Sequence, residues 1–164
     1  MPDVRAVRDA ERFDDPIPPD AEPVMMTNAY VELGGANLRC LALSVEIDPE
    51  NSPISQTSFC GVQDYPGPTK WHFRAKLAQS FSAGATHDTL YTALKDYEDA
   101  GDLLEYKVRA HASREISATN PSFEGELIPQ PYRLFGGDAG AASEVDIDWS
   151  CTGAPQINTG TASP

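Results

Sequence analysis

Apolar and polar positions alternate along much of the chain from residue 28 onward, and this alternation is typical of half-buried β-strands. Segment 69–81 shows it most clearly. One face of this segment is apolar and the opposite face is cationic: the apolar residues are Trp71, Phe73, Ala75 and Leu77, and the polar ones are Lys70, His72, Arg74 and Lys76. We predict further strands at 29–33, 37–47, 103–111, 122–128 and 143–150, with a last short strand after residue 152.

One segment follows a helical period instead. Leu90, Leu94 and Tyr97 recur at positions i, i+4 and i+7, so they share one face of a helix. Thr86 or Asp88 can serve as the N-cap, and Gly101 fits the position after the last turn. The pattern predicts a helix over 88–100 whose packing face is Leu90, Leu94 and Tyr97.

Two segments lack a clear period. Residues 48–68 contain four prolines and read as a long loop, and a loop of this length in a compact domain usually has a function of its own. Residues 1–24 contain charges of both signs and the proline-rich run 15–20, which favours an extended path. We therefore divide the chain into an extended N-terminal arm, 1–24, and one domain, 25–164.

The predicted fold class is mainly β: two packed β-sheets, as a sandwich or partial barrel, with one flanking α-helix. Fourteen prolines and twelve glycines in 164 residues agree with many turns and argue against a helical bundle. No apolar run approaches the length of a membrane span, and the N-terminus lacks the apolar region of a secretory signal. We expect Cys40, Cys60 and Cys151 to be reduced, two of them buried.

The charge balance is strongly acidic, with a formal net charge of −13. Such a chain cannot bind nucleic acid through phosphates, because that requires a basic surface. Two interpretations stay open at this point. The acidity is either that of an ordinary soluble protein, as in a salt-tolerant source, or that of a surface past which DNA must move without sticking.

No motif for catalysis or metal binding is present. His72, His87 and His111 stand in no spacing typical of zinc, and there is neither a nucleophile elbow nor a glycine-rich phosphate loop. The acidic residues at 96–102 lack the spacing of a calcium loop. A glycosidase-type pair of carboxylates stays open, since spatial pairing is invisible in one sequence. We expect no enzyme activity, no cofactor and no metal.

The stretch from Tyr30 to Thr159 resembles the major tail tube proteins of long-tailed (siphovirus-type) bacteriophages. The features that support the resemblance are an early strand ending in a glycine turn, a strand before the helix, the helix with its following strand, and a closing pair of strands. They lie at 31–35, at 71–84, at 88–110, and at 121–127 with 135–149 and 153–155. The N-terminal arm is longer than the simplest members of that family need.

The resemblance implies a structural subunit of a bacteriophage tail tube. Six subunits would form a ring, the rings would stack, and the lumen would conduct DNA into the host. Expected partners are further copies of the chain, a tape-measure protein, and tail tip and terminator proteins. The protein would be assembled in the host cytoplasm and belong to the tail of the virion, with DNA passing through without specific binding.

Two sets of residues gain a role from this resemblance. The loop 48–68 would stack one ring on the next through its apolar residues Ile54, Phe59, Val62 and Tyr65. One acidic strand face would line the lumen, with Glu124, Glu126, Asp146 and Asp148 as candidates, because like charge keeps DNA off the wall. The alternative is that these faces lie on the outer wall, as ordinary solvated strand faces do. The cationic row of 69–81 would lie at a subunit boundary opposite carboxylates. The alternative is an immunoglobulin-like or other β-sandwich binding module on a virion or cell surface.

Overall fold

A computed structural model describes residues 26, 28–81, 89–94 and 102–160. The elements in chain order are β1 (Tyr30–Leu33), β2 (Ala36–Asn37), β3 (Ala42–Asn51), β4 (Ile54–Ser58), β5 (Gly61–Tyr65), β6 (Thr69–Ala78), α1 (Leu90–Leu94), β7 (Leu104–Arg109), β8 (Ser122–Leu127), β9 (Glu144–Ser150) and β10 (Gln156–Asn158). The predicted N-terminal arm, 1–24, lies outside the described residues. Within the described part, no helix is long and apolar enough to span a membrane.

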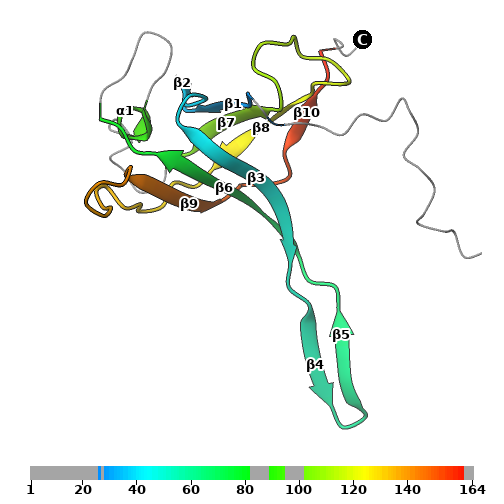
Figure 1. Cartoon of the computed structure of the whole chain (residues 1–164). Coiled ribbons are helices and arrows are strands. Elements are labelled where there is room, and N and C mark those ends of the chain that lie inside the picture. The colour runs from blue at the N-terminus through cyan, green and yellow to red at the C-terminus, as the bar shows by residue number, and fades with distance from the viewer. Residues whose placement is uncertain (1–25, 27, 82–88, 95–101, 161–164) are drawn as a thin grey trace, which may run out of the picture.

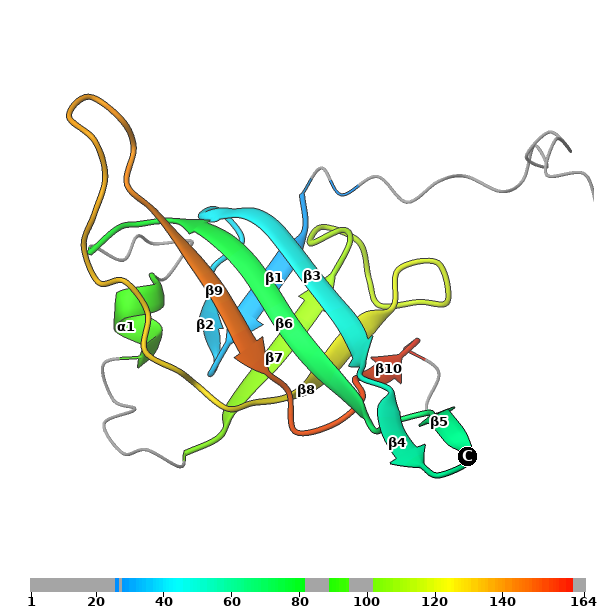
Figure 2. The same cartoon turned by 90° about the horizontal axis from the view of Figure 1, so that it is seen from below.

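Two antiparallel sheets pack face to face and form the body of the molecule (Figures 1 and 2). One sheet has five strands in the order β10-β8-β7-β1-β2, and the other has three in the order β3-β6-β9. The sheets do not close into a barrel in the described residues. The mainly β class with one flanking helix is confirmed.

The core lies between the two sheets and consists of the apolar side of each alternating strand. Phe73 of β6 meets Tyr106 of β7 across this space, with ring centroids 5.4 Å apart. The predicted inward faces of β6, β7 and β9 are confirmed, except that Trp71 is only half-buried. The buried residues of these three strands are Phe73, Ala75, Leu77, Leu104, Tyr106, Val108, Val145, Ile147 and Trp149.

The strand predicted at 37–47 is wrong as a single element. The chain turns at 38–41, where the amides of Leu41 and Ala42 both donate to the carbonyl oxygen of Leu38, at 2.9 and 3.1 Å. Leu38 itself is fully buried. The turn carries the chain from β2 in the five-stranded sheet to β3 in the three-stranded sheet, and an apolar run cannot reveal such a change of sheet.

The loop predicted at 48–68 is also wrong, because the segment forms β-structure almost throughout. β3 continues to Asn51, and β4 and β5 make a separate two-stranded ladder in which Ile54 lies opposite Tyr65 and Ser58 opposite Gly61. This hairpin projects well beyond the body in Figure 1. The prolines hid it from the sequence reading, but Pro53, Pro66 and Pro68 lie between the ladders, where no strand hydrogen bond is lost.

The described part of the predicted helix begins at Leu90, and its N-cap is neither of the two predicted residues. Thr89 is the N-cap: its hydroxyl accepts from the amide of Thr92 at 3.0 Å, and the Thr92 hydroxyl accepts from the amide of Thr89 at 2.9 Å. Leu90 is buried, and Leu94 is partly buried against the core. Tyr97, the third residue of the predicted packing face, lies outside the described residues, as do Thr86 and Asp88.

The prediction that two of the three cysteines are buried is wrong. All three are free thiols, with Cys40 and Cys60 exposed and Cys151 half-buried. Cys40 lies in the turn between the sheets and Cys60 at the tip of the projecting hairpin, so neither faces the core. Burial raises the pKa of the Cys151 thiol, and the Asp48 carboxylate acts in the same direction.

Candidate assembly surfaces

The projecting hairpin, residues 54–65, leaves the body without covering any part of it, and every one of its residues is exposed. An isolated two-stranded hairpin is marginally stable in water. Here polar side chains support it: the Ser55 hydroxyl donates to Asp64 at 2.5 Å, and the Tyr65 hydroxyl donates to Gln63 at 2.7 Å. A large exposed element of this kind indicates a surface made for a partner.

The four apolar residues predicted for ring stacking do not share one face of the projecting hairpin. Ile54 and Tyr65 are cross-strand partners at its base, on one face. Val62 lies opposite Thr57 on the other face, and Phe59 occupies the tip, fully exposed. A partner that touches all four must therefore surround the hairpin, whereas one that meets it end-on touches only Phe59.

The junction between the body and the hairpin is a narrow waist formed by Ser52, Pro53 and 66–68. A Cβ added at Gly67 would lie 1.8 Å from the carbonyl oxygen of Ser52. The two chain segments can approach this closely only because position 67 has no side chain. The waist thereby holds the hairpin in its direction relative to β3 and β6.

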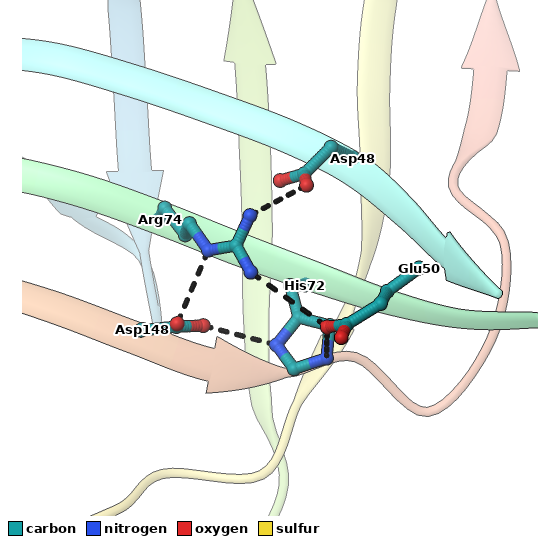
Figure 3. A network of polar contacts seen from close by, with 5 residues as sticks. All are labelled: Asp48, Glu50, His72, Arg74 and Asp148. Atoms are coloured by element: carbon teal, nitrogen blue, oxygen red, sulfur yellow. Dashed lines mark hydrogen bonds and ion pairs between the residues drawn. The ribbon is translucent and has the colours of Figure 1, made fainter. Parts of the chain in front are cut away.

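The outer face of the three-stranded sheet carries a network of ion pairs, drawn in Figure 3. His72 lies between two carboxylates, with Nδ1 2.9 Å from Asp148 and Nε2 3.3 Å from Glu50. Arg74 links both edge strands, since its guanidinium is 2.6 Å from Asp48 of β3 and 3.1 Å from Asp148 of β9. All five side chains point toward one another across the sheet.

The pKa values on this face follow from the pairing. Slight burial would raise the pKa of the Asp148 carboxyl, but hydrogen bonds from His72 and Arg74 outweigh it and hold the pKa below its usual range. The hydrogen bond to Asp148 raises the pKa of Arg74. Lys76, 2.6 Å from Glu144, has a raised pKa because of that contact. These pairs are half-exposed, so each adds little to stability.

These contacts bear on one expectation from the sequence. The cationic row on β6 was expected to meet carboxylates of another subunit. Its described partners instead come from the same chain, on the neighbouring strands β3 and β9. Asp148 lies directly opposite Arg74 in the register, whereas Asp48 and Glu144 reach Arg74 and Lys76 diagonally, each two residues from the directly opposite position.

The four candidates for the lumen wall fall on two different sheets. Glu124 and Glu126 lie on β8 in the five-stranded sheet, whereas Asp146 and Asp148 lie on β9 in the three-stranded sheet. The sheets pack through their apolar faces, so the two acidic pairs point away from each other. One flat wall cannot include both pairs from the same subunit.

Two polar residues with structural roles gave no signal in the sequence. Asn120 is almost completely buried, and its amide nitrogen donates to three carbonyl oxygens, those of His111, Arg114 and Glu115, at 3.0 to 3.2 Å. Gln79 donates to the carbonyl oxygens of Arg133 and Leu134. Both side chains hold loops in place by hydrogen bonds to main-chain oxygens. Because every residue has such an oxygen, this role cannot be recognised from the residue types in the sequence.

The described residues hold no group of three or more His, Cys, Asp or Glu side chains that could bind a metal ion. The main groove, on the outer face of the five-stranded sheet, is open and polar, with Glu105, Glu124, Glu126 and Thr152 among its lining residues.

Comparison with known proteins adds one finding. No family model matches the sequence, and no curated protein matches it. Among solved structures, the chain is similar to the anti-feeding prophage cap, described as a tube terminating cap, with a TM-score of 0.52 and 14% identity. The likeness covers 92% of this chain and 99% of the other. The two proteins therefore share a fold over nearly their whole length.

Proposed function

We propose that this chain is a structural subunit of a bacteriophage tail tube, which forms rings of six that stack around a DNA-conducting lumen. The observation that carries the proposal is the likeness to a tube terminating cap over nearly the whole of both chains. The projecting hairpin supports it, since an element with no contact to its own domain needs a neighbour. The number six and the tape-measure, tip and terminator partners rest on the resemblance to tail tube proteins.

In this proposal the three-stranded sheet faces the lumen. A ring whose sheets join side by side needs long strand edges with free backbone groups. The edges of the three-stranded sheet are β3 and β9, which have ten and seven residues. The five-stranded sheet ends instead in β10 and β2, which have three and two residues. Asp146 and Asp148 would then face the duct, and Glu124 and Glu126 the outside.

The charge on that sheet suits a duct for a polyanion. Carboxylates outnumber cations on its outer face: the acids are Glu46, Asp48, Glu50, Glu144, Asp146 and Asp148, and the cations are Lys70, Arg74 and Lys76. Arg74 and Lys76 are held in ion pairs with the acids, which reduces their attraction for phosphates. DNA near such a wall meets net negative charge.

A second candidate function follows from the printed description of the structural neighbour. This chain could close a tube instead of building one, as a terminating ring. The two functions differ in growth: tube subunits add ring upon ring, whereas a terminator stops at one.

Electron microscopy of the purified protein at neutral pH tests the proposal. We expect tubes, or rings with a central hole, that lengthen with protein concentration. Single rings that never stack would favour the terminating function. A monodisperse monomer at every concentration would overturn both and favour a β-sandwich binding module.

A further inference from the structure

A second apolar surface lies at the end of the body opposite the projecting hairpin. It consists of Phe81 after β6, Tyr91 of α1, and Leu134 and Phe135 in the segment between β8 and β9, and we call it the far-end patch. All four side chains are exposed, Phe135 by 80%. Phe81 and Tyr91 pack edge to face, with ring centroids 5.7 Å apart. Phe81, Tyr91 and Leu134 border a shallow hollow.

The far-end patch is held in place by the body. Gln79, just beyond β6, donates through its side chain to the carbonyl oxygens of Arg133 and Leu134. The Ser143 hydroxyl donates to the Gln79 side-chain oxygen at 2.5 Å, and the Gln79 amide donates to the Ser143 carbonyl at 2.8 Å. The backbone that presents Leu134 and Phe135 is therefore tied to the sheet, as a pre-organised binding surface requires.

The far-end patch and the projecting hairpin cannot meet within one chain. They lie beyond opposite ends of β6, which runs from Thr69 to Ala78, as both views show (Figures 1 and 2). A strand of this length separates its ends by about 30 Å at roughly 3.3 Å per residue. Two different apolar surfaces, one at each end of β6, allow copies of the chain to join head to tail.

The two surfaces also match in charge. The one charged side chain within the projecting hairpin is Asp64. Beside the far-end patch lies Arg133, which is exposed and donates to the main-chain oxygen of Glu144 at 2.8 Å. Asp64 lies one ladder pair from the base of the hairpin and not at its tip, so its carboxylate attracts this guanidinium only at longer range, as two copies approach.

We infer that the tip of the projecting hairpin of one copy binds the far-end patch of the next copy, with Phe59 as the central contact. This inference rests on the proposed function and names the acceptor of the stacking contact. An aromatic ring buried among Phe81, Tyr91, Leu134 and Phe135 provides the large apolar contact that dominates interface energies. Because each copy carries one donor and one acceptor, stacking continues without limit, as in a growing tube and not as in a terminating ring.

Cross-linking through the protein's own thiol tests the contact directly. Cys60 is exposed next to Phe59, so a thiol introduced by Phe135→Cys should form a disulfide with Cys60 of the next copy. The background carries Cys40→Ser, which removes the other exposed thiol. After mild oxidation of tubes we expect a ladder of cross-linked chains on a non-reducing gel. The matched control places the thiol at Ile157→Cys, which is also exposed, on β10 at the edge of the other sheet, and should give no ladder.

Complementation separates this inference from the proposed function. Phe59→Asp removes the donor and Phe135→Asp the acceptor, both at exposed positions where circular dichroism should stay native. Neither variant alone should form stacks, whereas a mixture should form limited pairs of rings through the one intact contact. Two results would overturn the contact and leave the proposed function standing. The first is that Phe135→Asp forms normal tubes, as wild type does. The second is that tubes form but give no cross-linked ladder. Wild-type protein that never forms rings or tubes would overturn both.

Discussion

Tyr106 lies over Gly125 across the β7–β8 ladder, so a Cβ at position 125 would fall 2.7 Å from the Tyr106 phenolic oxygen. Tyr106 is almost completely buried and also contacts Phe73 of the opposite sheet. Burial raises the pKa of its phenol, with the neighbouring Cys151 acting in the same direction. The glycine therefore makes room for the largest aromatic contact between the two sheets.

The first prediction follows from this contact. Gly125→Ala should lower the free energy of unfolding by about 1 to 3 kcal/mol, because overpacking forces a buried ring to move. Urea denaturation followed by tryptophan fluorescence measures the change. Gly153→Ala is the matched control, since a Cβ there meets nothing within 4 Å, and it should stay within about 0.5 kcal/mol of wild type. Equal stability of the two variants would show that the Tyr106 ring can move aside at little cost in free energy.

The second prediction concerns removal of the projecting hairpin. Asn51 and Thr69 already lie opposite each other, so residues 52–68 can be replaced by Asn-Gly, the preferred two-residue turn. The body should keep its fold, because the removed residues bury none of the core, and tube growth should stop. Circular dichroism should be native-like in the absence of tubes by electron microscopy. Normal tubes from this variant would assign stacking to another part of the chain.

The third prediction is a pH dependence from Asp148. Its folded pKa is below the ordinary value of about 3.9, so the carboxylate stabilises the fold above that pH, and this contribution is lost as pH falls through the folded pKa. Asp148→Asn should cost less than about 1 kcal/mol at pH 7, since the pair is half-exposed, and the cost should shrink as pH falls toward 2. Asp146→Asn, on the same strand and face but outside the network, is the control. An equal loss at both pH values would mean that the effect is not ionic.

The fourth prediction decides which sheet faces the duct. Glu46→Lys with Asp146→Lys reverses charge on the three-stranded sheet and keeps all five residues of the Arg74 network, although position 46 lies opposite Arg74. Glu124→Lys with Glu126→Lys reverses charge on the five-stranded sheet. Virions carrying the first variant should release DNA more slowly at low salt, where the Debye length reaches about 30 Å at 0.01 M. Virions carrying the second should release DNA normally. The reverse result would mean that the five-stranded sheet, and not the three-stranded sheet, faces the duct.

The strands of the core could be predicted because their signal is local. Phe73, Ile147 and Trp149 stand at every second position among polar residues, and they are buried as this spacing requires. The pairing of strands could not be predicted in the same way. Alternation places Glu124 and Asp146 on outward faces, but it does not say that their strands belong to different sheets.

The roles of the candidate surfaces stay predictions, and the structure shows only where their residues lie. The apolar residues of 48–68 led to the prediction that this segment contacts another subunit. All of these apolar side chains are exposed. Their placement at the base, on the flank and at the tip of a hairpin depends on a register that the prolines obscured. The far-end patch gave no signal at all, because Phe81, Tyr91 and Leu134 come together only after two loops and a helix meet at the end of β6.

The break between the two ladders at the waist has a consequence for amide hydrogen exchange. With Pro53, Pro66 and Pro68 at the junction, the β4–β5 ladder receives no cooperative support from β3 and β6. Its amide protons should exchange with solvent in free subunits almost as fast as in an unfolded peptide, while those of β6 exchange only when the body opens. Burial of the hairpin in a neighbour would slow its exchange, so deuterium uptake at 54–65 should report the fraction of subunits that have joined a stack.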